Sequence, residues 1–196
     1  MWFDAVSYFT NDVKIISEYR EKFKSGILLD TTPLMTLFLG KFDEKNGTKL
    51  LENFSMKEGI TNRKLNSNDF EILRQFINGL NRFEFFITPH IFTEAIQHIW
   101  KITSPEQFTD IIKYFFNDYS FLQEFPICCK EISKNENFQN KKLEIGDISL
   151  MIENSKKSKT IISIDMTMME IADYDGFLVI PFQFLTTAIK YTIPNI

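Results

Sequence analysis

Four acidic residues lie where carboxylates would gather at one edge of a sheet: Asp30, Glu94, Asp147 and Asp165. Asp30 ends the apolar run 26–29, and Asp165 ends the run 160–164. An isolated ionised carboxylate is costly to bury. Several carboxylates that converge also raise one another's pKa unless a cation neutralises them. The four acids therefore indicate a site for a divalent metal ion.

The elements that must position these acids alternate between strands and helices. Short apolar runs predict strands at 27–29, 84–87, 160–164 and 176–180. Periodic apolar residues predict helices at 33–39, 69–78, 89–101, 106–117, 128–133, 147–155 and 166–172. This alternation predicts an α/β fold with a central, mostly parallel sheet covered on both faces. Ligands bind beyond the carboxyl ends of such strands, which is where the acids are expected.

Helix starts carry recognisable signals. Thr32-Pro33, Thr88-Pro89 and Ser104-Pro105 each place an N-cap residue before a proline in the first helical position. Asn68 with Glu71 forms a further candidate capping box, and Gly40 is a candidate helix end. These signals divide the chain into short helices between the predicted strands.

The length of 196 residues fits a single domain over 1–196. An amphipathic helix at 11–24 is expected within the amino-terminal segment 1–26. The polar stretch 41–67, with the helix that follows it, predicts an insertion at 41–80 between the first and second strands.

Composition limits the partners and the compartment. The net charge of −4 and the pI near 5.3 provide no overall positive field, so contact with a nucleic acid would need local clusters such as 141–142 or 156–159. Cys128 and Cys129 are adjacent, which disfavours a disulfide between them. The amino terminus lacks the basic region of a signal peptide, and the uncharged stretch 176–189 is too short and polar to span a bilayer. These features predict a cytoplasmic protein without a membrane partner.

Four short motifs, in order, resemble those of the PIN domain family of metal-dependent ribonucleases. They are Leu28-Leu29-Asp30-Thr31-Thr32, Thr88-Pro89-His90-Ile91-Phe92-Thr93-Glu94, Gly146-Asp147-Ile148-Ser149 and Ser163-Ile164-Asp165. The spacing of 18 residues between the last two acids is typical of that family, whereas the 64 residues between the first two are accommodated by the insertion. The resemblance covers residues 27–180.

The resemblance implies a three-layer α/β/α fold and a divalent-metal-dependent endoribonuclease that hydrolyses RNA phosphodiester bonds. It implies that the four acids bind Mg²⁺ or Mn²⁺ and are catalytic. The side chains expected to support them are Thr31, Thr32, Ser149 and Ser163. It also implies three possible settings, namely a toxin blocked by a small antitoxin protein, an RNA-processing enzyme or a defence nuclease. A homodimer is a further expectation.

Three alternatives stay open from the sequence. The family usually has Asn where this chain has Thr32, so a catalytically weakened domain that binds RNA or a protein partner is the main alternative. His90, Glu94 and His98 share one helix face, but three ligands along one helix do not easily converge on one ion. A phosphatase with an aspartate nucleophile would need a second Asp at position 32, where Thr stands.

Overall fold

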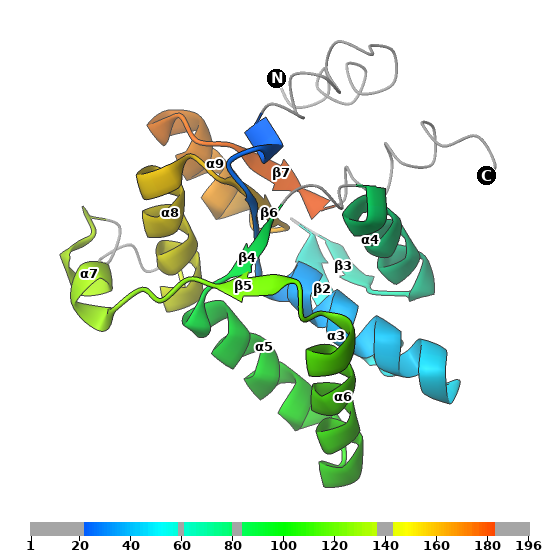
Figure 1. Cartoon of the computed structure of the whole chain (residues 1–196). Helices are drawn as coiled ribbons and strands as arrows, with labels where there is room; N and C mark the ends of the chain where they lie inside the picture. The colour runs from blue at the N-terminus through cyan, green and yellow to red at the C-terminus, as the bar shows by residue number, and fades with distance from the viewer. Residues whose placement is uncertain (1–21, 59–60, 80–83, 137–142, 183–196) are drawn as a thin grey trace, which may run out of the picture.

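The computed structural model describes residues 22–58, 61–79, 84–136 and 143–182 (Figure 1). Its centre is a sheet of five short strands: β1 (Ile27–Leu29), β4 (Phe85–Ile87), β5 (Leu122–Glu124), β6 (Thr160–Ser163) and β7 (Val179–Pro181). The strand order is β5-β4-β1-β6-β7, and every pairing in this sheet is parallel. The expected α/β fold with a central parallel sheet is therefore confirmed.

The order of the strands creates a switch point beside the central strand. From β1 the chain moves outward to β4 and β5, then returns to the other side of β1 to form β6 and β7. Connections that leave in opposite directions open a crevice at the carboxyl ends of the two strands where the direction changes. Asp30 directly follows β1, and Asp165 lies two residues beyond β6. The switch point thus lies at two of the four predicted acids.

Helices form a layer on each side of the sheet (Figure 1). One layer contains α3 (Thr31–Asn46), α4 (Ser67–Gly79), α5 (Pro89–Ile102) and α6 (Pro105–Asp118), in which α3 packs against the other three. The other contains α7 (Cys129–Lys134), α8 (Ile145–Lys157) and α9 (Met166–Asp175). The short helix η1 (Leu51–Asn53) and the antiparallel hairpin β2 (Ser55–Glu58) with β3 (Thr61–Lys64) connect α3 to α4. No helix among the described residues is long and apolar enough to cross a membrane.

Aromatic side chains build much of the core between α3, α5 and α6. Phe38 of α3 is fully buried and stacks on Phe115 of α6, with ring centroids 3.9 Å apart. Phe92 of α5 packs against both rings. Parallel strands buried on both faces have continuous apolar sequences, and β1 and β4 follow this rule, because every residue in them is buried.

The helix expected at 33–39 is wrong at both ends. Asp30, not Thr32, is the N-cap of α3, and the helix runs through Gly40 to Asn46, where Gly47 ends it with a φ of 63°. A Cβ on Gly40 would lie 2.3 Å from the ring of Phe70. Glycine at this position therefore allows α4 to approach α3 closely, and the first six residues of the predicted insertion belong to α3.

Other predicted boundaries were confirmed or shifted. The starts of α5 at Thr88-Pro89 and of α6 at Ser104-Pro105 are confirmed, the second with a complete capping box to Gln107. The start of α4 is two residues earlier than predicted, since Asn66 and Asp69 exchange the capping hydrogen bonds. Strand β5 was not predicted, because it is short and exposed at the edge of the sheet. The helix predicted at 11–24 lies almost wholly outside the described residues.

Candidate functional site: a cluster of carboxylates

Asp30 joins β1 to α3 and is 6% exposed. As the N-cap it accepts a hydrogen bond from the backbone N–H of Thr31 on Oδ1, at 2.6 Å. Its Oδ2 accepts one from the Ser163 hydroxyl at 2.5 Å. The start of α3 also favours a negative charge through the helix dipole. The local structure therefore fixes the orientation of this carboxylate without supplying a positively charged side chain.

Ser163 links the first acid to the fourth. Its hydroxyl oxygen accepts a hydrogen bond from the backbone N–H of Asp165 at 2.9 Å while it donates to Asp30. Asp165 in turn caps α9, because its Oδ1 accepts hydrogen bonds from the N–H groups of Thr167 and Met168 at 2.6 and 3.0 Å. The supporting position predicted for Ser163 thus corresponds to a contact with Asp30.

Asp147 and Glu94 come from the first two turns of α8 and α5. Asp147 is 7% exposed, and its Oδ2 accepts a hydrogen bond from the backbone N–H of Glu144 at 2.8 Å. A Cβ added to Gly146 would lie 2.7 Å from Oε2 of Glu94. The absence of a side chain at Gly146 therefore leaves room for the Glu94 carboxyl beside the start of α8.

A chain of hydrogen bonds holds these two helix starts together. The backbone N–H of Ile91 donates to the Thr88 hydroxyl at 3.3 Å, and the Thr88 and Ser149 hydroxyls lie 2.6 Å apart. The Ser149 hydroxyl donates to the carbonyl of Gly146 at 2.6 Å. The support predicted for Ser149 is therefore indirect, because its hydroxyl connects α5 to α8 and its hydrogen bonds go to no acid.

The electrostatics of the cluster reflect burial and mutual repulsion. The pKa of Asp30 is raised to about 6 because the carboxyl is buried, and the charges of Asp165 and Glu144 act in the same direction. Burial also raises the pKa of Glu94 to about 7, with further contributions from Glu144 and Asp30. Asp147 has a pKa of about 8, since burial is reinforced by the charges of Asp30, Asp165 and Glu94. The four predicted acids are thus close enough to influence one another.

A fifth acid, Glu144, was missed from the sequence. It is the N-cap of α8, its backbone holds Asp147, and its charge acts on Asp30 and Glu94. The sequence does contain a signal for it, since Glu144 and Asp147 have the spacing of a capping box. The prediction took Gly146-Asp147 as the opening of this helix, and overlooked the residue before Ile145.

The donor set suits a hard divalent cation, which prefers carboxylate and hydroxyl oxygens. The Thr31 hydroxyl adds a second indication, because it is buried near the Glu94 carboxyl without a well-formed hydrogen bond to any of the described residues. Buried hydroxyls are normally satisfied. As they stand, no three Asp, Glu, His or Cys side chains in the described ranges converge closely enough to hold an ion. Loading a metal would therefore require the carboxylates to move closer together.

The alternative histidine ladder does not form a site. His90 Nε2 lies 3.1 Å from the carbonyl oxygen of Ile127 and faces the segment before α7. His98 Nε2 lies 3.7 Å from Oε1 of Glu94, but burial and Lys101 lower the pKa of His98. His98 is thus the neighbour of Glu94 that the spacing predicted, whereas His90 is not. Thr32 lies buried in the first turn of α3.

The basic cluster at 156–159 offers less positive surface than the sequence indicated. Lys156 pairs with Glu131 at 2.6 Å, and Lys157 lies over the ring of Phe125. Lys159 is 2% exposed and cannot contact a ligand at the surface. The other predicted cluster, 141–142, lies outside the described residues.

Both cysteine thiols are free and exposed.

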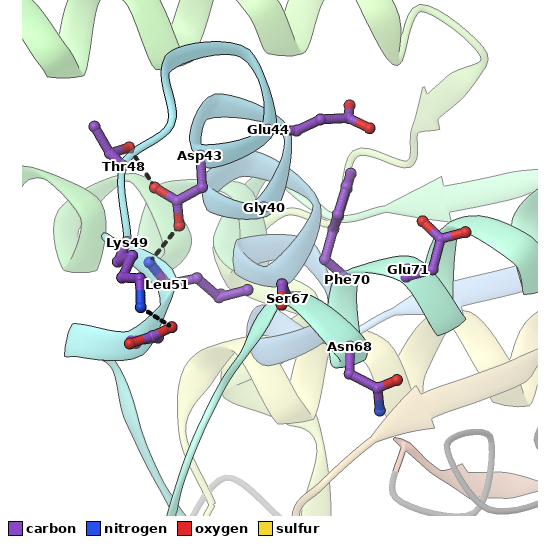
Figure 2. Close-up of a pocket in the computed structure, with 11 residues that line it drawn as sticks. Gly40, Asp43, Glu44, Thr48, Lys49, Leu51, Ser67, Asn68, Phe70 and Glu71 are labelled. Atoms are coloured by element: carbon purple, nitrogen blue, oxygen red, sulfur yellow. Dashed lines mark hydrogen bonds and ion pairs between the residues drawn. The ribbon is translucent and has the colours of Figure 1, made fainter.

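A cavity of about 590 Å³ lies away from the acids, between the second half of α3, the segment 48–52 and the start of α4 (Figure 2). Figure 2 shows Asp43 turned toward Thr48 and Leu51. Its oxygens accept hydrogen bonds from the Thr48 hydroxyl at 2.5 Å and from the N–H of Leu51 at 2.9 Å. This carboxylate holds its own loop in place, so the cavity does not share the chemistry of the cluster.

Comparison of the chain with protein-family models, with curated proteins and with solved structures found no match.

Proposed function

We propose that the chain is a divalent-metal-dependent endoribonuclease whose active site is the carboxylate cluster. One observation carries the proposal: four acids from four separate segments lie close enough to act on one another's charge at the switch point of a parallel sheet. In the described chain no cationic side chain is bonded to any of the four apart from His98, whose pKa is lowered. Such an arrangement disfavours its own ionised form, which a bound cation would restore. RNA is the substrate class that the sequence resemblance implies.

The four acids share one part in this proposal, and three hydroxyl side chains support them. Asp30, Glu94, Asp147 and Asp165 would hold Mg²⁺ or Mn²⁺, and a bound ion of this kind activates water and stabilises negative charge on a phosphoryl group. The Ser163 hydroxyl bonds to the Asp30 carboxylate and to the backbone of Asp165, so it fixes these two residues relative to each other. The link between Thr88 and Ser149 keeps the helices that carry Glu94 and Asp147 from separating. An antitoxin partner and a homodimer stay predictions from the same resemblance.

The proposal is tested by incubating purified protein with a pool of structured RNAs in Mn²⁺, Mg²⁺ or EDTA. The variants are Asp30→Asn and Asp147→Asn, with Asp110→Asn as the matched control, because Asp110 is a half-exposed acid of α6 that pairs with Lys113. We expect cleavage in either metal, none in EDTA, and a loss of at least about 100-fold in both cluster variants only.

Two results would contradict the nuclease. Cleavage that persists in both cluster variants would place the chemistry elsewhere or in a contaminant. Metal binding and RNA binding without cleavage of any RNA in the pool would favour the alternative of a binding domain.

A further inference from the structure

We propose that Glu144 is a fifth acidic ligand of this site, which grips a divalent cation together with Glu94. The inference rests on the proposed metal site but concerns a residue outside the four acids that the sequence motifs identify. Glu144 is exposed, so it would complete the coordination of the cation from the solvent side of the cluster.

The first support is the position of Glu144 in the chain. Its backbone N–H donates to Oδ2 of Asp147 at 2.8 Å, so the residue cannot move independently of the third acid. Two residues later, the backbone at Gly146 approaches the Glu94 carboxyl so closely that a Cβ there would lie only 2.7 Å from Oε2. The turn 144–146 therefore lies between Asp147 and Glu94, within reach of both.

The second support is the contact between two carboxyl groups. Burial and then the charge of Glu144 raise the pKa of Glu94, so the two carboxyl groups lie near each other. His98 lies in the same neighbourhood, and burial together with the charge of Lys101 lowers its pKa. Two acidic groups held together in this way provide oxygen ligands for one hard cation.

The third support is independent of the acids. Thr31 is 7% exposed, and its buried hydroxyl lies near Glu94 without a well-formed hydrogen bond among the described residues. A buried hydroxyl beside an acidic cluster that lacks a well-formed hydrogen bond marks space for a polar ligand. Thr31 and Glu144 then both lie beside Glu94.

The test is Mn²⁺ binding to the full chain at pH 7.5, measured by calorimetry or by the loss of the free Mn²⁺ spin-resonance signal. Glu144→Gln keeps the backbone contact to Asp147 and removes the charge. Glu144→Asp keeps the charge but withdraws the carboxylate by one methylene. The matched control is Glu106→Gln, which removes an exposed glutamate at the start of α6.

We expect both Glu144 variants to bind Mn²⁺ at least about 10-fold more weakly than the unmodified chain, and Glu106→Gln to bind within twofold of it. If Mn²⁺ affinity falls in Glu144→Gln but not in Glu144→Asp, Glu144 acts on the ion only through its charge at a distance and is not a ligand. That result would overturn the inference. So would unchanged binding in both. If the unmodified chain binds no Mn²⁺, the proposed function itself fails, which separates the two conclusions.

Discussion

The two ends of the sheet bury charge in opposite ways. Near the start of β6, Lys159 and Glu153 are both 2% exposed and pair at 3.0 Å. The Lys159 ammonium also lies 4.5 Å from the ring centre of Phe86 and 4.4 Å from that of Phe125. At the edge where β1 and β6 end, Asp30 and Asp147 are nearly as buried, but the described residues around them supply only neutral hydrogen-bond donors and other acids.

This difference separates a structural charge from a functional one. A buried ion must be paired or neutralised, and the chain itself supplies the partner at one end. At the other end the acids are buried and repel one another, and the two effects together raise the pKa of three of them. A ligand is expected at the end of the sheet where the buried acids lack a positively charged partner.

The largest expected effect comes from breaking the paired end. Lys159→Met leaves Glu153 buried, and the one other ion-pair partner it has among the described residues is Lys157, 3.9 Å away at the surface. We expect the free energy of unfolding to fall by about 3–5 kcal/mol, because an uncompensated buried charge remains. Urea denaturation followed by circular dichroism measures it.

The double variant Lys159→Met/Glu153→Leu is the matched control. It should recover most of the loss, since apolar replacements of a buried pair are often neutral. A loss below about 1 kcal/mol in the single variant would show that Glu153 finds water or Lys157 instead, and the contrast between the ends would weaken.

The opposite sign is expected at the unpaired end. The folded-state pKa values of Asp30, Glu94 and Asp147 exceed those of the unfolded chain, so the metal-free fold binds more protons between about pH 4 and pH 8. Its free energy of unfolding should therefore fall as the pH rises through this window. Asp147→Asn should stabilise the metal-free protein at pH 8 by on the order of 1–3 kcal/mol.

Thermal unfolding in EDTA at pH 5 and pH 8, then at pH 8 with Mn²⁺, checks this sign. Mn²⁺ should raise the Tm of the unmodified chain at pH 8 and leave that of Asp147→Asn almost unchanged. A metal-free protein that gains stability from pH 5 to pH 8 would contradict the repulsion between the acids.

The smallest expected effect compares two hydroxyls, one near each end. Thr31 and Thr160 are both buried with hydroxyls that lack a well-formed hydrogen bond in the described parts of the chain. Replacing either by valine should raise the metal-free stability by roughly 1 kcal/mol or less, because an unsatisfied polar group is removed. Only Thr31→Val should also weaken Mn²⁺ binding, by a few-fold. Equal Mn²⁺ affinity in both variants would remove Thr31 from the site.

Much of the candidate site could be predicted from local sequence. Asp30 and Asp165 follow buried strands, and Thr88-Pro89 starts the helix that carries Glu94, so strand ends and caps were sufficient to place them. Glu144 could not be assigned to the site from local sequence in the same way. Its own surroundings, an exposed residue after a polar segment, resemble those of any surface glutamate until α8 is placed against α5.

The sequence by itself determined the alternation of strands and helices, the parallel sheet and the edge at which the acids lie, because periodicity and helix caps depend on near neighbours along the chain. Tertiary structure alone decided which charges are paired. Gly40 became a helix-packing position when Phe70 was brought against it, and Lys159 became a core residue when Glu153 and two aromatic rings surrounded it. Contacts between residues distant in sequence set burial and repulsion, and these decide whether an acid or a lysine is structural or available for a ligand.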